Sequence, residues 1–175
     1  MALSASFGGG SDYSTAGMIQ YDSDTSFPYI VLDSTQHGSS TNVGAKMFNM
    51  VVCHDLFDTC ERLKIFLKDV VQRYPGIQIL LWNYPGQAFT EFREGQTLNN
   101  DYHAGCLYEL LEHVGPNGTN QFNNQRPYYI MGYGNGVSIA SFFAAHYKAP
   151  FLRAMLNVNG FSFVDPHFAA IMHGT

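Results

Sequence analysis

A chain of 175 residues has the length of one ordinary domain. Hydrophobic residues make up 46% of it and charged residues only 13%, which is enough apolar material for a core and argues against an intrinsically disordered chain. The formal net charge is -5 and the nine Lys and Arg residues form no basic cluster, so no nucleic-acid partner is expected. No apolar run is long enough to cross a bilayer, so no membrane span is expected.

Residues 1–26 are predicted to be a flexible N-terminal arm, because the segment begins with a long run of small and polar side chains. The arm has no basic region followed by an apolar run. No secretory signal is therefore predicted, and the expected compartment is the cytoplasm. The three cysteines lack paired spacing and are expected to be free thiols. Residues 27–175 are predicted to form the folded domain.

The first half of this domain contains three apolar runs and one amphipathic segment. Residues 27–33 and 47–54 predict strands, the second apolar enough to be buried on both faces. Residues 59–74 predict a helix, with Thr59 able to cap its start. Residues 77–84 predict another buried strand. The apolar face of the helix is predicted to consist of Leu63, Phe66, Leu67, Val70 and Val71.

The second half begins with a polar segment, residues 88–100, which is predicted to be loop. Residues 101–114 predict an amphipathic helix and residues 128–133 a strand. Residues 137–147 have little polar surface and predict a largely buried helix. A last strand is predicted over 153–161. The apolar face of the first of these helices is predicted to consist of Leu107, Leu110, Leu111 and Val114.

Strands that alternate with helices predict an α/β domain, with a mostly parallel sheet and right-handed crossovers. In such sheets, binding and catalytic sites gather at the carboxyl ends of the strands. The segments expected at those ends are His54-Asp55, Tyr84-Pro85-Gly86, Gly132-Tyr133-Gly134 and Asn157 to Asn159.

The sequence GYGNG joins a predicted strand to a predicted helix and has the shape of the nucleophile elbow G-x-S-x-G. Gly134 stands where the serine belongs, and glycine has no atom that could form a covalent intermediate. We interpret the segment as a vestigial elbow in which no residue is catalytic. Its members are Gly132, Tyr133, Gly134, Asn135 and Gly136.

A dinucleotide-binding turn is an alternative interpretation of the same glycines, because such turns place phosphates on a helix N-terminus. The fingerprint G-x-G-x-x-G or A requires a small third residue, and Val137 stands there. The acidic residue expected after the next strand is absent, and Asn157 and Asn159 occupy that region. The sequence therefore predicts no cofactor.

The loop after the second predicted strand contains His54 and Asp55. In α/β-hydrolases this loop supplies one backbone amide of the oxyanion hole. A carboxylate at that place is unfavourable for an oxyanion intermediate. Asp165 follows the last predicted strand, where the acid of a triad could lie. We expect a vestigial pocket formed by His54, Asp55, Asn159 and Asp165.

His54 could also be interpreted as a metal ligand, together with His37 or His103. No HExxH motif or paired spacing supports that interpretation. The expected role of His54 is a hydrogen bond to neighbouring backbone, and no metal is predicted.

Four motifs in order carry a resemblance to a known family: His54-Asp55, Pro85-Gly86-Gln87, Gly132-x-Gly134-x-Gly136 and Asn157-Val158-Asn159. Over residues 47–160 the sequence resembles the N-myc downstream-regulated proteins, a branch of the α/β-hydrolase superfamily. The resemblance implies an α/β-hydrolase-like fold without hydrolase activity, acting in the cytoplasm through protein partners. The predicted elements stop before the C-terminal strands that the family fold would continue with.

The sequence thus favours a non-catalytic scaffold or interaction module, with a protein partner or self-association covering an open sheet edge. Two alternatives remain open. One is an active esterase with an atypical nucleophile or with Asp55 as a water-activating carboxylate. The other is a small-ligand binder that uses the vestigial pocket above Gly134.

Overall fold

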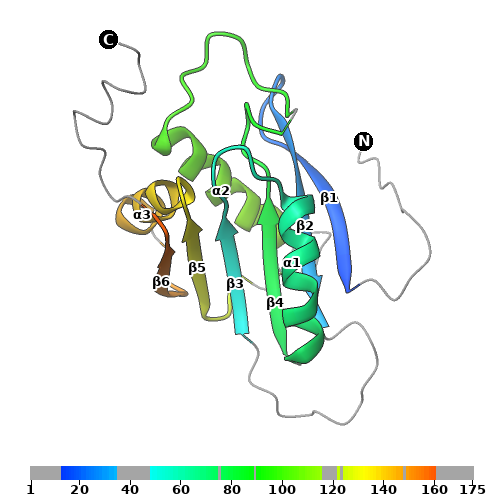
Figure 1. Cartoon of the computed structure of the whole chain (residues 1–175). Helices are drawn as coiled ribbons and strands as arrows, with labels where there is room; N and C mark the ends of the chain where they lie inside the picture. The colour runs from blue at the N-terminus through cyan, green and yellow to red at the C-terminus, as the bar shows by residue number, and fades with distance from the viewer. Residues whose placement is uncertain are drawn as a thin grey trace.

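The computed structural model of the chain describes residues 13–34, 48–74, 76–88, 90–115, 122, 124–147 and 149–160. These residues form a six-stranded sheet with helices on both faces (Figure 1). The strands are β1 (Ser14–Gln20), β2 (Ser26–Asp33), β3 (Phe48–Cys53), β4 (Ile77–Trp82), β5 (Tyr128–Tyr133) and β6 (Leu152–Val158). The helices are α1 (Cys60–Arg73), α2 (Asn100–Val114) and α3 (Gly136–His146).

The strand order across the sheet is β1-β2-β4-β3-β5-β6. The four strands β4, β3, β5 and β6 are mutually parallel, and the crossovers between them contain the helices. β2 is antiparallel to both of its neighbours, β1 and β4. The predicted mostly parallel α/β sheet is therefore confirmed, with an antiparallel pair at one edge.

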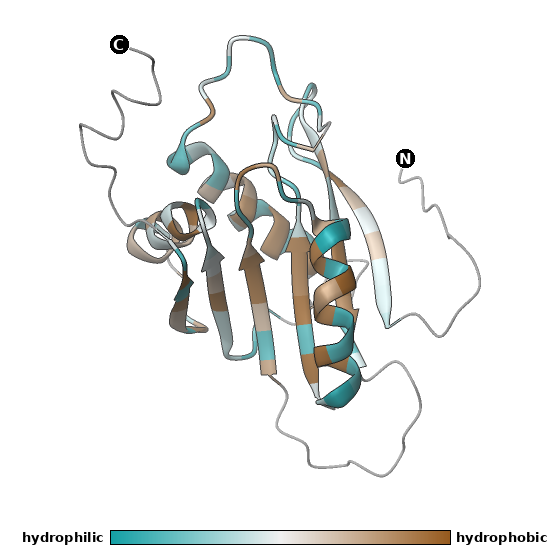
Figure 2. Ribbon diagram, in the orientation of Figure 1, coloured by the Kyte–Doolittle hydropathy of each residue, from teal (hydrophilic) through white to brown (hydrophobic). Residues whose placement is uncertain are grey.

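Alternating side chains of the central strands pack into two separate cores. On one face, Leu80 and Trp82 of β4 join a large cluster with α2 and α3. On the other face, Ile79 and Leu81 pack with Val71 of α1 in a smaller cluster. Figure 2 shows β3 and β4 as largely hydrophobic and β1 as pale, because only the central strands are covered on both faces.

The predicted helix starts are correct to within one residue. The Thr59 side chain accepts a hydrogen bond from the backbone of Arg62 and caps α1 as predicted. The predicted apolar face of α1 is wrong at Phe66, whose side chain is 64% exposed. The residues of α1 that pack on the sheet follow a narrow stripe through Leu63, Leu67 and Val71, and Phe66 lies beside that stripe. The predicted apolar face of α2 is confirmed in full.

The predicted N-terminal arm is wrong for residues 14–20, which form β1, while residues 1–12 lie outside the described part. β1 has little apolar character of its own, and only Ile19 is buried. Its pairing with β2 places Gly17 opposite Tyr29, and a Cβ at Gly17 would lie 2.5 Å from the Tyr29 ring. β1 forms because it pairs with the edge of β2, where Tyr29 leaves room for a glycine. The sequence of residues 14–20 alone does not reveal this pairing.

Candidate functional site

The carboxyl ends of β3, β5 and β6 meet at one edge of the sheet, as expected for parallel strands. Residues 54–58 follow β3, residues 134–136 join β5 to α3, and residues 159–160 follow β6. The Gly134 N–H donates to the Val158 carbonyl at 3.0 Å, which ties the β5–α3 turn to the end of β6. The predicted vestigial elbow and part of the predicted pocket are thereby brought together.

The turn between β5 and α3 has the tight geometry that the glycines predict. Gly134 has φ +57°, a left-handed conformation that favours glycine. A Cβ at Gly132 would lie 2.5 Å from the Cα of Val137, and one at Gly136 would overlap the Cys53 carbonyl. The flanking glycines therefore allow α3 to start directly against β5 and β3.

The carboxylate of Asp55 occupies the space above Gly134. Its Oδ1 accepts hydrogen bonds from the backbone N–H of Asn135 at 2.7 Å and from the backbone N–H of Leu56 at 2.8 Å. A Cβ placed on Gly134 would overlap the carboxyl group of Asp55. A side chain at position 134 and the carboxylate of Asp55 are thus mutually exclusive in this conformation.

The two backbone donors to Asp55 correspond in position to an oxyanion hole. That site is built from the N–H of the residue after the elbow residue and from an N–H of the loop after the third strand. Asn135 follows the elbow position, and Leu56 lies in the loop after β3. A fixed anion already accepts from both donors, so neither is free for a tetrahedral intermediate.

The Asp55 carboxylate also completes the N-terminus of α3. Asn135 makes no side-chain capping bond, and the first turn of α3 contains no acidic residue. The helix dipole and its unpaired N–H groups favour an anion at this place. Asp55 supplies both the acceptor and the negative charge from a neighbouring loop.

We expect Asp55→Ala to lower the free energy of unfolding by about 1–3 kcal/mol, because it leaves the partly buried N–H of Asn135 and the exposed N–H of Leu56 without their acceptor and removes the anion at the start of α3. Asp55→Asn keeps one side-chain oxygen and should cost only about 0.3–1 kcal/mol through the lost charge. Urea unfolding measures both. Asp101→Ala, an exposed acid in the first turn of α2, is the matched control. An Asp55→Ala cost no larger than that of Asp101→Ala would show that the carboxylate does not hold the turn together.

His54 is fully buried beside this turn. Its Nδ1 lies 2.7 Å from the Asp55 carbonyl oxygen, which can only accept, so the proton is on Nδ1. Its ring stacks on Tyr84 at 4.1 Å between centroids, and the Tyr84 hydroxyl donates to the His54 carbonyl at 2.7 Å. Burial lowers the pKa of His54, so the imidazole is neutral at neutral pH. The predicted bond of His54 to neighbouring backbone is confirmed.

The alternative metal site gains no support from the described residues. Among them, no group of three or more His, Cys, Asp and Glu side chains could hold a metal ion. His103 Nε2 lies 3.2 Å from the Pro85 carbonyl and donates to it, and its ring packs against Tyr84. His37 lies outside the described residues.

The other predicted site residues make fewer contacts with the turn at Gly134 or lie outside the described residues. Asn159 is exposed and has φ +49°, just beyond the end of β6. Tyr133 is half-buried at the end of β5. Asp165 lies outside the described residues. The predicted pocket is thus represented in the described part by His54, Asp55 and the backbone around Asn159.

Two residues of the site, Leu56 and Phe57, were not predicted from the sequence, and a third, Tyr84, was expected at a strand end but without its contact to His54. Leu56 contributes only its backbone N–H, which no sequence pattern reveals. Tyr84 is buried under His54, and its position after an apolar strand was the one available signal. Phe57 has φ +64° although its side chain is 95% exposed. An aromatic residue rarely adopts this conformation, and no sequence rule would place it there.

The architecture has clear counterparts among solved structures. MGS-M2, an alpha/beta hydrolase enzyme from a Medee basin deep-sea metagenome library, matches with a TM-score of 0.65 at 18% identity, over 90% of this chain and 49% of that protein. The alpha/beta hydrolase GrgF from Penicillium sp. sh18 matches with a TM-score of 0.63 at 12% identity, over 91% of this chain and 53% of that protein. The fold is that of the α/β-hydrolases.

MenH from S. aureus shares the α/β-hydrolase-like fold, with a TM-score of 0.59 at 13% identity over 82% of this chain and 46% of its own. The chain spans about half the length of the proteins it resembles. No protein-family model matches the sequence, and no curated protein matches it. In the described part of the α/β-hydrolase-like domain, no helix has the length and apolar character needed to span a membrane.

Proposed function

We propose that this α/β-hydrolase-like domain is non-catalytic and acts by binding another protein. The contact between Asp55 and the turn at Gly134 carries the first half of the proposal. A glycine stands at the nucleophile position, and a carboxylate occupies the space that a nucleophile and an oxyanion would need.

The cysteines offer no replacement nucleophile. Cys53, Cys60 and Cys106 are free, as predicted, and all three are buried. Burial raises the pKa of each of these thiols to about 12, which keeps them protonated. The active-esterase alternative would then depend on Asp55 as a general base, and its Oδ1 is already engaged with two N–H groups.

The order of the motifs supports a relationship to the N-myc downstream-regulated proteins, and we propose that branch as the frame for the domain's role. His54-Asp55 and the glycine turn at Gly134 form one connected structural unit, in which Asp55 accepts from the turn. Gly134 leaves the space that the Asp55 carboxylate occupies, so the two residues fit each other. Such a pair fits a domain that has kept the fold for binding other proteins and not for catalysis. The solved structures with similar folds include hydrolases. We propose that this chain differs from them at the elbow, where Gly134 and the Asp55 carboxylate stand.

The second half of the proposal concerns the open edge of the sheet at β6. Among the described strands β6 pairs only with β5, and no described strand lies along its other side. Leu156 is 55% exposed on this strand, and Arg153 is its one charged residue. An unprotected edge strand with an apolar side chain is a template for pairing with another chain. We propose that a strand of a second protein molecule pairs with this edge, and that this molecule is a second copy of the same chain.

Light scattering after size-exclusion chromatography tests this surface. We expect the average mass of the chain to rise with protein concentration and Leu156→Lys to return it to a monomer, because a charge at an edge opposes strand pairing. Ile65→Lys is the matched control, since Ile65 is 73% exposed on α1 and away from β6. A monomer at every concentration, or equal disruption by Ile65→Lys, would refute self-association through β6.

A further inference from the structure

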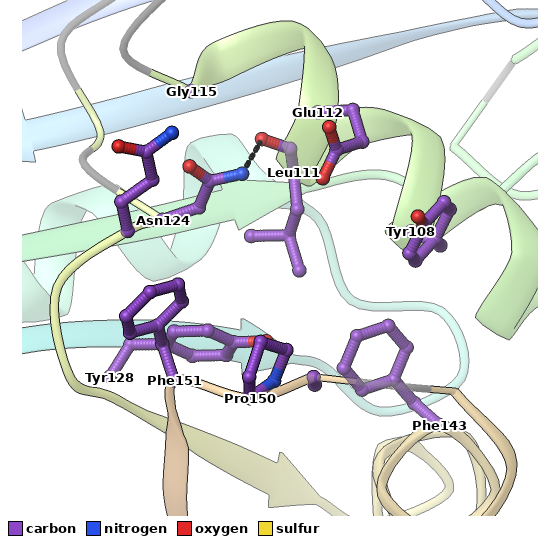
Figure 3. Close-up of a pocket in the computed structure, with 11 residues that line it drawn as sticks. Tyr108, Leu111, Glu112, Gly115, Asn124, Tyr128, Phe143, Pro150 and Phe151 are labelled. Carbon is purple, nitrogen blue, oxygen red and sulfur yellow. Dashed lines mark hydrogen bonds between the residues drawn. The ribbon is translucent and has the colours of Figure 1, made fainter.

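A cavity of about 210 Å³ lies at the opposite end of the sheet from the glycine turn. It is formed where the end of α2, the start of β5, α3 and the segment before β6 come together (Figure 3). β5 separates it from Gly134, and six residues of strand span about 20 Å. The cavity is therefore distinct from the site described above. Its lining residues are Tyr108, Leu111, Glu112, Gly115, Asn124, Gln125, Tyr128, Phe143, Ala149, Pro150 and Phe151.

Four aromatic rings make up much of the wall: Tyr108, Tyr128, Phe143 and Phe151. Tyr128 and Phe143 are buried, whereas Tyr108 and Phe151 are each 36% exposed and stand at the opening. Figure 3 shows Tyr128, Phe151 and Phe143 along one side of the cavity, across from the polar side chains of Glu112 and Asn124. One side of the cavity is thus aromatic, and the α2 side, here called the polar side, combines Glu112 and Asn124 with Leu111 and Tyr108.

The polar side carries negative charge. Among the described residues that line the cavity, Glu112 is the one carboxylic acid, and none of them is a Lys, Arg or His. Burial, and next the charge of Glu112, raise the pKa of Tyr128 to about 12, so the phenol stays neutral beside the carboxylate. The Asn124 amide donates to the Leu111 carbonyl at 2.8 Å, which fixes the orientation of the amide. Its Oδ1 is buried and faces Gly115, so Glu112 is the side chain that gives this side of the cavity its charge.

We propose that this cavity binds a small organic ammonium ion. Aromatic faces attract a cation through their negative quadrupole, and the attraction is strongest where water is excluded. The Glu112 carboxylate adds a direct charge interaction from the opposite side. Inorganic divalent cations are a poor match, because they need several oxygen ligands and Glu112 is the one carboxylate among the described lining residues. An ammonium ion with alkyl substituents fits both the aromatic side and the carboxylate, and choline is small enough for the volume.

Calorimetric titration of the purified chain with choline and with tetramethylammonium tests the proposal. We expect both cations to bind and to raise the unfolding temperature, since a ligand that binds only the folded state stabilises it. The neutral analogue of choline, in which carbon replaces the quaternary nitrogen, should bind at least about fivefold more weakly. Equal binding of the neutral analogue would show that the cavity selects apolar shape and not positive charge, and would overturn the proposal.

Two variants test which side chains of the cavity contribute to choline binding. Glu112→Gln should weaken choline binding by about tenfold, and Phe151→Leu, which removes a ring at the opening, by about fivefold. Glu109→Gln is the control, because Glu109 is an exposed acid on the same helix that does not line the cavity. Glu112 is itself exposed, so its variant should keep its fold, and the unfolding temperature without ligand checks this. Absence of binding by either cation, or an equal loss in Glu109→Gln, would overturn the assignment.

Discussion

Gly136→Ala should destabilise the domain by at least about 3 kcal/mol, or prevent folding altogether. A Cβ at this position would overlap the backbone carbonyl of Cys53 and lie 2.6 Å from the carbonyl oxygen of His54. These atoms belong to the end of β3, which is held between β4 and β5 and cannot move away. Chemical unfolding of the variant, monitored by circular dichroism, measures the loss.

Gly105→Ala is the matched substitution in another helix. A Cβ at Gly105 would meet only the hydroxyl ends of Tyr147 at 3.1 Å and Tyr21 at 3.5 Å, and these side chains can shift. Alanine is favoured over glycine inside a helix, so the expected change is a gain of up to about 1 kcal/mol. Opposite signs for the two variants would support the close approach of α3 to β3, whereas a small effect at Gly136 would contradict it.

Acidification below about pH 6.5 should destabilise the domain through His54 and His103. Burial lowers the pKa of both side chains, so at mildly acidic pH the unfolded chain binds protons that the folded chain does not. The carboxylates of Asp55 and Asp58 oppose this effect at His54, but burial is the larger influence. Stability is therefore fully present above the unfolded pKa and falls with pH until the folded pKa is reached, by about 1.4 kcal/mol per pH unit for each histidine.

Urea unfolding across mildly acidic to neutral pH measures this slope. His103→Gln should remove about half of it, because glutamine does not titrate. A free energy of unfolding that stays level or rises between neutral pH and pH about 5 would contradict the neutral, buried state of these rings.

The sequence predicted elements well where their signal is local. β4 and β5 are mostly apolar runs, and the α2 stripe of Leu107, Leu110, Leu111 and Val114 is buried as expected. β1 was missed because its stability comes from the edge of β2 and from the fit of Gly17 against Tyr29. Strand formation there depends on a partner and not on propensity, which explains the error.

The sequence predicted the two segments of the site but not the hydrogen bond that joins them. The glycine turn and the His54-Asp55 loop were both identified, yet they lie 80 residues apart, and nothing in either segment gives the hydrogen bond between them. The left-handed backbone of Phe57 runs against residue preference. The cavity between α2 and α3 joins side chains from five segments, and no linear motif describes such an arrangement.

The hydrolysis of an aryl acetate by the purified, folded chain tests the proposed lack of catalysis most directly. The Asp55 carboxylate above Gly134 leads us to expect the same rate for the folded chain, the Asp55→Asn variant and the heat-unfolded chain. Gly134→Ser should add nothing, because its side chain would compete with the Asp55 carboxyl group for the same space. Saturable turnover by the folded chain that Asp55→Asn abolishes would contradict the account and establish a hydrolase.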